Sequence, residues 1–340
     1  MTEDKIEQSL LDTLAQMGWD IVNGPTIGPD GTMEREYTDV VLERRLDIAL
    51  RRLNPDLQPA QRDEVIKRVV RTGGVDLLAD NRDFHTLLTD GVNVEYRHDD
   101  GSVRTTQVRL FDFENPTNND FVAINQLTVI QDEINRRPDL VLYVNGIPLV
   151  VIELKNAADS AASLGVAYHQ IQTYKQQISS LFRFNELCVI SDGLDARVGT
   201  ITAPRERFMA WKTIDGEREL DGMPEMETLA RGMFDKVRLL DIVRNFVVFE
   251  RDGKDYAKFV KKVAAYHQYW AVNKSVVRTV AATQGDHRAG VVWHTQGSGK
   301  SLSMMFYAGK LIGEPVLGNP TIVVITDRND LDGQLFGTFS

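Results

Sequence analysis

The chain contains one cysteine, Cys188, among 340 residues, and it has no long uninterrupted apolar segment. A single cysteine excludes an internal disulfide, and its place in the apolar run from Leu187 to Ile190 favours a buried thiol over a nucleophile or a metal ligand. A membrane-spanning helix needs about 18 consecutive apolar residues. The charged amino terminus also lacks the apolar core of a signal peptide. We therefore expect a soluble protein of the reducing cytoplasm.

Positive charge is also scarce, because 39 lysines and arginines stand against 49 aspartates and glutamates, for a formal net charge of -10. Proteins that coat nucleic acid nonspecifically depend on cations that neutralise phosphates. The charge balance argues mildly against that class, so any contact with DNA is expected to be local or shared with partner subunits. Acidic residues are, however, what a divalent metal site requires. Hydrophobic residues make up 42% of the chain, which is enough for two cores.

Hydrophobic periodicity predicts an amino-terminal helical layer followed by a mixed sheet. Helical spacing occurs over 4–17 and in a region over 38–72. Segments rich in β-branched and aromatic residues are expected to be strands, at 92–96, 103–113, 121–130, 187–190 and 197–201. Two more, 140–144 and 149–154, are apolar on both faces, as expected for central strands. With a helix near 160–180, this order predicts one mixed α/β core.

Turn residues between 215 and 255 predict a domain boundary around a helix at 229–249. An aromatic-rich helix is expected next, over 256–272. Expected strands at 291–292 and 321–326 then flank a glycine-rich loop, which gives a β-loop-α-β order. We therefore expect a first domain over 1–225, a helical linker over 226–255 and an incomplete second domain over 256–340.

Three polar residues in the expected sheet predict a divalent metal site. Glu153 and Lys155 are two positions apart on an expected strand, so their side chains point to the same face. Asp139 begins the preceding strand, and Asn145-Gly146 is a turn signal between the two. A hairpin with a three-residue loop centred on Gly146 would place Asp139 directly opposite Glu153.

Two carboxylates and one backbone carbonyl, that of Leu154, would offer oxygen ligands to a hard divalent ion and leave room for water and a phosphate oxygen. Mg²⁺ is the natural occupant, and phosphodiester hydrolysis is the reaction that suits it. The Lys155 ammonium would orient the attacking water or offset developing charge. The alternative is a capped turn and a surface ion pair on an edge strand. Charges inside the apolar segment 149–155 argue against that alternative, because a central strand tolerates them only when they are paired or ligated.

Gln170 and Tyr174 strengthen the hypothesis of a metal site. Four-residue spacing on a helix places both side chains on one face. There they could hold a water, the metal shell or a DNA phosphate. Without a site beside them, they would be two amphipathic surface residues.

A second motif, residues 294–301, predicts a phosphate-binding loop. Gly297 and Gly299 allow backbone amides to wrap around phosphate oxygens, Lys300 reaches the outer phosphates, and the Ser301 hydroxyl is offered to Mg²⁺. His294 replaces the usual first glycine of this pattern. The expected loop residues are Gln296, Gly297, Ser298, Gly299, Lys300 and Ser301.

These segments resemble the restriction subunit of type I restriction enzymes, a PD-(D/E)xK nuclease followed by a RecA-like superfamily 2 helicase lobe. The resemblance is carried by Pro138-Asp139, 146–156, 170–174 and 293–301. It implies that Asp139, Glu153 and Lys155 form the catalytic triad. It also implies that Gln170 and Tyr174 belong to an accessory motif. Glu133 and His85 are the candidates for an upstream acidic position that some relatives use, although His85 could equally be a helix-surface histidine.

The resemblance also extends to the second motif. Residues 266–269 resemble an adenine-contacting segment in which Gln268 reads the base, and 326–334 resemble a DNA-contacting motif. The implied cofactors are Mg²⁺ and ATP. The implied partners are double-stranded DNA and the methyltransferase and specificity subunits, with cleavage following ATP-driven translocation in the family.

Too few residues follow Ser301 to complete a motor with its acidic motif and second lobe. We therefore expect this chain to bind ATP weakly at most, and neither to hydrolyse it nor to translocate DNA. Two alternatives stay open: a noncatalytic fragment that only docks on partner subunits, and a stand-alone nuclease that needs no ATP.

Overall fold

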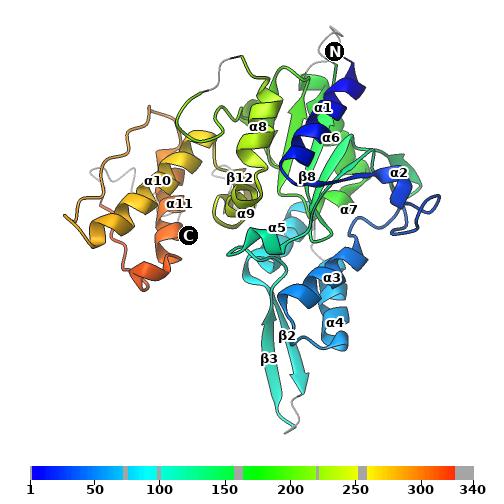
Figure 1. The fold of residues 1–340 in the computed structure, drawn as a ribbon, viewed down its shortest axis with the longest axis horizontal. Coiled ribbons are helices and arrows are strands. Elements are labelled where there is room, and N and C mark those ends of the chain that lie inside the picture. Colours follow the sequence, from blue (N-terminus) through cyan, green and yellow to red (C-terminus); the bar gives the residue numbers. More distant parts are fainter. Residues whose placement is uncertain are drawn as a thin grey trace.

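A six-stranded mixed sheet forms the centre of the first two thirds of the chain (Figure 1). The computed structural model describes residues 2–71, 76–97, 101–156, 164–219, 222–251 and 259–325. The sheet has the order β1 (Asp20–Asn23), β4 (Phe121–Asn125), β7 (Leu140–Val144), β8 (Ile147–Leu154), β9 (Leu187–Ser191) and β10 (Ala196–Gly199). The β1/β4 and β8/β9 pairs are parallel and the other pairs are antiparallel.

The two strands that are apolar on both faces occupy the middle of the sheet, as predicted. Every residue of β7 and of β8 is buried, because layers of other elements cover both faces. The alternative of an edge strand for Glu153 is therefore wrong, since β8 lies between β7 and β9. Cys188 on β9 is fully buried, which confirms the predicted burial of its thiol.

Helices cover the sheet and also form a helical layer beside it. The longer ones are α1 (Glu3–Gln16), α3 (Glu43–Leu53), α4 (Pro59–Val70), α5 (Leu77–Asp90), α6 (Leu164–Gln177), α8 (Glu225–Met233) and α9 (Lys236–Asn245), and the short ones are α2 (Gly24–Ile27) and α7 (Ser179–Phe182). Helices α1 and α6 both contact β8. The ribbon of β2 (Val92–Arg97) and β3 (Val103–Val108) projects away from the body (Figure 1).

Several predicted strands and helices are shorter in the structure than the sequence indicated. The strand expected over 103–113 ends at Val108, and the one expected over 121–130 divides into β4 and a small hairpin of β5 (Val129–Gln131) and β6 (Ile134–Arg136). The break falls at Gln126, whose φ of 53° is left-handed and cannot continue a strand. The helical region expected over 38–72 begins only at Glu43 and is interrupted before Pro59.

The helix predicted over 229–249 was wrong at its end. Helices α8 and α9 occupy most of it, but Val247 begins β11 (Val247–Arg251), which pairs with β12 (Phe259–Val263). The β-branched Val247 and Val248 find strand partners in Val263 and Lys262, and this pairing outweighs the helical periodicity. Helix α8 packs against α1.

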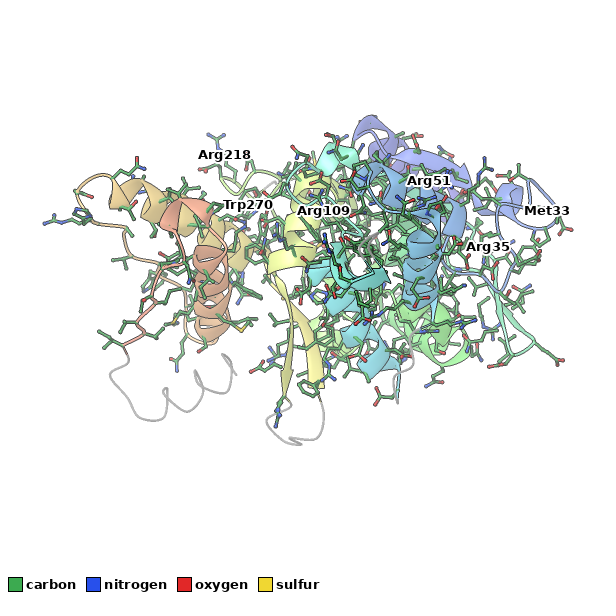
Figure 2. All side chains as sticks on the ribbon, turned by 90° about the horizontal axis from the view of Figure 1, so that it is seen from below. Met33, Arg35, Arg51, Arg109, Arg218 and Trp270 are labelled. Carbon is green, nitrogen blue, oxygen red and sulfur yellow. The ribbon has the colours of Figure 1, made fainter. Side chains whose placement is uncertain are left out.

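Two long helices lie at one side of the molecule, beyond α9 (Figure 1). They are α10 (Tyr266–Thr283) and α11 (Lys300–Ile312). Figure 2 shows Trp270, which belongs to α10, on that side and apart from Arg51 and Arg109. The predicted strands beside the loop are absent from 290–295 and from 321–325. Val291 and Ile325 are 94% and 88% exposed, and without a neighbouring strand their backbone has no ladder to join.

The turn between β7 and β8 contains two residues rather than the predicted three. Asn145 and Gly146 have φ angles of 50° and 79°, which is the type I′ arrangement. A register shift between Leu142 and Tyr143 compensates for the shorter turn. On the site side of this shift, residues pair as predicted, for example Leu140 with Ile152. The loop prediction was therefore wrong, while the register that it implied at the site is present because a bulge compensates.

We expect Gly146→Ala to destabilise the protein by about 2–3 kcal/mol, because its left-handed φ disfavours a side chain. An added Cβ would also collide with the carbonyl oxygen of Leu42. Urea unfolding would measure the loss. Gly222→Ala is the matched control, since Gly222 has a φ of 84° but open space around it. Equal losses in both variants would show that the collision contributes nothing.

Candidate active site and nucleotide loop

Asp139 and Glu153 lie side by side at one end of the central strands. Leu140 is opposed to Ile152 in the β7/β8 ladder, so Asp139 and Glu153 occupy the next opposed position. Both carboxylates are buried, with exposures of 9% and 2%. The backbone N–H of Leu154 donates to Oδ2 of Asp139 at 2.7 Å, which fixes one oxygen of that carboxylate against β8.

Lys155 completes the group from the end of β8. Its ammonium donates to Oε1 of Glu153 at 2.6 Å and to the Leu154 carbonyl oxygen at 2.7 Å. It also lies 3.6 Å from Oε1 of Glu3 on α1. The other oxygen of Glu153, Oε2, is buried and has no hydrogen bond of standard geometry among the described residues, although the Tyr174 hydroxyl lies close enough to interact with this carboxylate.

The surroundings of Asp139 and Glu153 raise the pKa of both carboxyl groups. Burial, opposed by the Leu154 N–H, raises the pKa of Asp139 to about 6. Burial and then the negative charge of Asp139 raise the pKa of Glu153 to about 8, against the opposing effect of Lys155. Burial makes the ionised forms of these two carboxyl groups unfavourable, and a cation between them would stabilise the ionised forms. The orphaned Oε2 of Glu153 therefore fits a divalent ion held by Asp139, Glu153 and the Leu154 carbonyl.

Helix α6 brings Gln170 and Tyr174 to the same place. Tyr174 is buried, and its hydroxyl donates to the carbonyl oxygen of Arg137 at 3.3 Å. Burial and the charges of Glu153 and Asp139 raise the pKa of Tyr174, while Gln170 beside it acts in the opposite direction. The Tyr174 hydroxyl therefore stays protonated and serves as a hydrogen-bond donor next to the carboxylates.

Two acidic residues of α1 near the site were missed by the sequence reasoning. Glu7 accepts hydrogen bonds from Asn125 Nδ2 at 2.7 Å and from Gln126 Nε2 at 2.6 Å. The charges of Glu3 and Glu7 both add to the rise in the pKa of Asp139. Their four-residue spacing on a helix was the available signal, but nothing in the sequence shows that α1 reaches this end of the sheet.

The two upstream candidates named from the sequence belong to other elements than the carboxylate pair. Glu133 is exposed in the β5/β6 turn with a φ of 66°. His85 on α5 contacts Glu186 at 3.0 Å, and Glu186 immediately precedes β9, whereas Ile190 near the other end of β9 is the partner of Glu153. His85 therefore lies at the end of β9 opposite to Glu153, whereas Glu133 stays a prediction for the upstream position.

The predicted phosphate loop leads into α11. Gly297 and Gly299 have φ angles of 81° and 80°, and the helix begins at Lys300. The ammonium of Lys300 donates to the carbonyl oxygens of His294 and Thr295 at 3.0 and 2.9 Å. Backbone amides and one lysine at a helix amino terminus are the groups that bind phosphate oxygens.

Gln268 of α10 reaches this loop from a distant part of the chain. Its Nε2 donates to the Gly299 carbonyl oxygen at 3.0 Å, and its Oε1 accepts from the backbone N–H of Ala265 at 2.9 Å. The ring of His267, the preceding residue, lies 5.1 Å from the ring of His294. Gln296, Ser298 and Ser301 belong to the same loop and helix start. Residues 326–334, the predicted DNA-contacting motif, lie outside the described residues.

The sequence matches the family described as "Type I restriction enzyme R protein N terminus" over residues 1–207. The chain belongs to this family. Residues 267–340 match a second family, described as "SWI2/SNF2 ATPase". The restriction-family match contains Asp139, Glu153 and Lys155, and the ATPase match contains Gln268 and the phosphate loop.

Two curated relatives match nearly the whole length of this restriction-family chain. It is 46% identical over 100% of its residues to the type I restriction enzyme HindI endonuclease subunit of Haemophilus influenzae, of which it covers 33%. It is 30% identical over 98% to a provisionally named type I restriction enzyme MjaIXP endonuclease subunit of Methanocaldococcus jannaschii, of which it covers 34%. The chain therefore spans about a third of the length of these relatives. Within the described ranges, no helix is long and apolar enough to cross a membrane.

Proposed function

We propose that this chain carries the nuclease of a type I restriction enzyme and hydrolyses phosphodiester bonds in double-stranded DNA with Mg²⁺. The observation that supports this most directly is the buried pair Asp139 and Glu153 beside Lys155. The mixed sheet with these residues at the end of its central strands supports a PD-(D/E)xK nuclease fold. We also propose that the methyltransferase and specificity subunits are the partners, as in a type I complex.

The residues at the site divide the chemistry between them. Asp139, Glu153 and the Leu154 carbonyl would hold Mg²⁺, which supplies positive charge to polarise the phosphoryl group and acidify a bound water. The Lys155 ammonium orients that water or offsets negative charge in the transition state. Gln170 and Tyr174 hold a water, the metal shell or a DNA phosphate, with the protonated Tyr174 hydroxyl as the donor.

We propose three domains with the limits 1–225, 226–255 and 256–340. The matched segments, 1–207 and 267–340, fall within the first and the last of these. In the last, a RecA-like lobe would bind ATP through Gln268 and the loop residues 296–301, with Lys300 on the outer phosphates. Cleavage in the complete enzyme would be coupled to ATP-driven translocation of DNA.

Supercoiled plasmid incubated with the purified chain and Mg²⁺, with and without ATP, tests the nuclease. We expect nicking that falls by about 1000-fold in Glu153→Ala and in Lys155→Ala, because each removes charge from the transition state. Lys262→Ala is the matched control, since this exposed lysine pairs with Glu250 far from the site. Equal nicking without ATP would show that the nuclease acts uncoupled from a motor. Nicking that survives both substitutions, or none at all, would instead favour the docking fragment.

A further inference from the structure

Two of the oxygens available to the proposed divalent ion, Glu153 Oε1 and the Leu154 carbonyl oxygen, are already bonded by the ammonium of Lys155. This single group contacts Oε1 of Glu153 at 2.6 Å and the Leu154 carbonyl oxygen at 2.7 Å. Both distances are those of charge-assisted hydrogen bonds. Of the three proposed ligand residues, only Asp139 is not bonded by the ammonium, and its Oδ2 accepts instead from the Leu154 N–H.

A divalent ion and this ammonium cannot use the same two oxygens together. Mg²⁺ binds oxygen at about 2.0–2.1 Å, so an ion on Glu153 Oε1 and the Leu154 carbonyl would nearly coincide with the Lys155 nitrogen. The two cations would also repel each other in a buried setting, where charge interactions are strong. An ion on these two oxygens therefore requires departure of the ammonium, and an ion on the other oxygen of Glu153, Oε2, would still repel an ammonium bonded to Oε1 of the same carboxylate.

Exchange between the two cations leaves the buried carboxylates compensated throughout. Glu153 is nearly fully buried beside Asp139, and removal of a bonded cation from such a pair is costly. Lys155 provides the positive charge in one arrangement, and the divalent ion provides it in the other. Glu3 on α1, 3.6 Å from the ammonium and with a side chain 45% exposed, offers a carboxylate at the rim toward which Lys155 can turn.

We propose that Lys155 is sequestered by Glu153 and the Leu154 carbonyl, and that a divalent ion releases it toward Glu3 and the DNA. This proposal rests on the proposed nuclease function and adds an order of events to it. Lys155 is unavailable to an attacking water or a phosphate until the metal site is filled. The lysine thus prevents the site from engaging DNA in a productive arrangement before its cofactor has bound.

Limited acetylation of the whole chain with acetic anhydride, read by mass spectrometry of peptides, tests the release. An amine held in a charge-assisted hydrogen bond reacts slowly with the anhydride. Loss of about 1.5 kcal/mol of that interaction corresponds to about a tenfold increase in the rate of acetylation. We expect Mg²⁺ to increase acetylation of Lys155 about tenfold, without DNA present. Lys236, whose ammonium donates to the Gly18 carbonyl oxygen away from the site, is the internal control and should not change.

Glu153→Gln and calorimetry separate the possible outcomes. In Glu153→Gln we expect Lys155 to react rapidly without Mg²⁺ and to show no further increase with it, because the amide holds an ammonium weakly. Titration of Mg²⁺ by calorimetry, with Asp139→Asn as a variant that lacks a ligand, shows whether the metal binds. Metal binding with unchanged Lys155 acetylation would overturn the release proposal alone. No binding dependent on Asp139 would overturn the proposed metal site and, with it, the release.

Discussion

Replacement of Glu153 by glutamine is expected to abolish DNA cleavage while stabilising the fold at alkaline pH. Cleavage should fall by about 1000-fold, because the proposed ion loses a charged ligand. The pKa of Glu153 is about 8 in the folded protein against an ordinary value of 4.5. The folded state therefore keeps the proton to a higher pH than the unfolded chain does.

The sign of the pH effect follows from this raised pKa. Stability contributed by the protonated Glu153 is fully present below pH 4.5 and is lost as the pH rises through about 8. Glutamine cannot ionise, so Glu153→Gln should be more stable than the parent protein by about 4–5 kcal/mol at pH 9 and nearly equal to it at pH 4. Urea unfolding in metal-free buffer at both pH values measures the difference. A Glu227→Gln control, in a partly exposed ion pair with Arg231, should show little change, and a destabilised Glu153→Gln at pH 9 would contradict the prediction.

Removal of a lysine from a second buried cluster is expected to cause the largest loss of stability. Lys261 on β12 is fully buried, and its ammonium contacts Glu186 Oε2 at 2.7 Å and donates to Asn81 Oδ1 at 2.9 Å and to the Asn185 carbonyl oxygen at 2.8 Å. Glu186 also contacts His85 at 3.0 Å. The charges of His85 and Lys261 lower the pKa of Glu186 in spite of its burial, so the carboxylate is ionised. These contacts join β12 to α5 and to the start of β9.

Lys261→Ala should destabilise the protein by about 3–5 kcal/mol, because it leaves Glu186 charged and incompletely paired in the interior and opens a cavity. The neighbouring Lys262→Ala removes an exposed ion pair with Glu250 and should cost at most about 1 kcal/mol. Thermal and urea unfolding of both variants would compare them directly. Similar, small losses in both would show that the buried cluster contributes little to stability.

Local chemistry that depends on spacing could be read from the sequence. The alternation of a strand places Glu153 and Lys155 on one face, and helical spacing places Gln170 and Tyr174 on another, wherever those elements lie. The same holds for the glycines of the phosphate loop, whose left-handed φ angles few other residues adopt. The apolar segments that became β7 and β8 could be predicted as central strands, because only such strands need apolar residues on both faces.

Long-range proximity could not be read in this way. The sequence contained no signal that α1 would place Glu3 and Glu7 beside Asp139, or that His85 would face Glu186. The hairpin register at the site matched the expectation only because a bulge offset a turn one residue shorter than predicted. Segments 291–292 and 321–325 failed as strands because a strand needs a partner, which periodicity does not provide.

The sequence by itself thus determined which residue types share a face and which chemistry they suit, since these properties depend on spacing over a few residues. Only the tertiary structure decided that both carboxylates are buried side by side, that Lys155 occupies two oxygens of the proposed metal site, and that β12 is anchored through Lys261. These properties depend on contacts between residues far apart in the chain and on the low polarity created when those contacts exclude water.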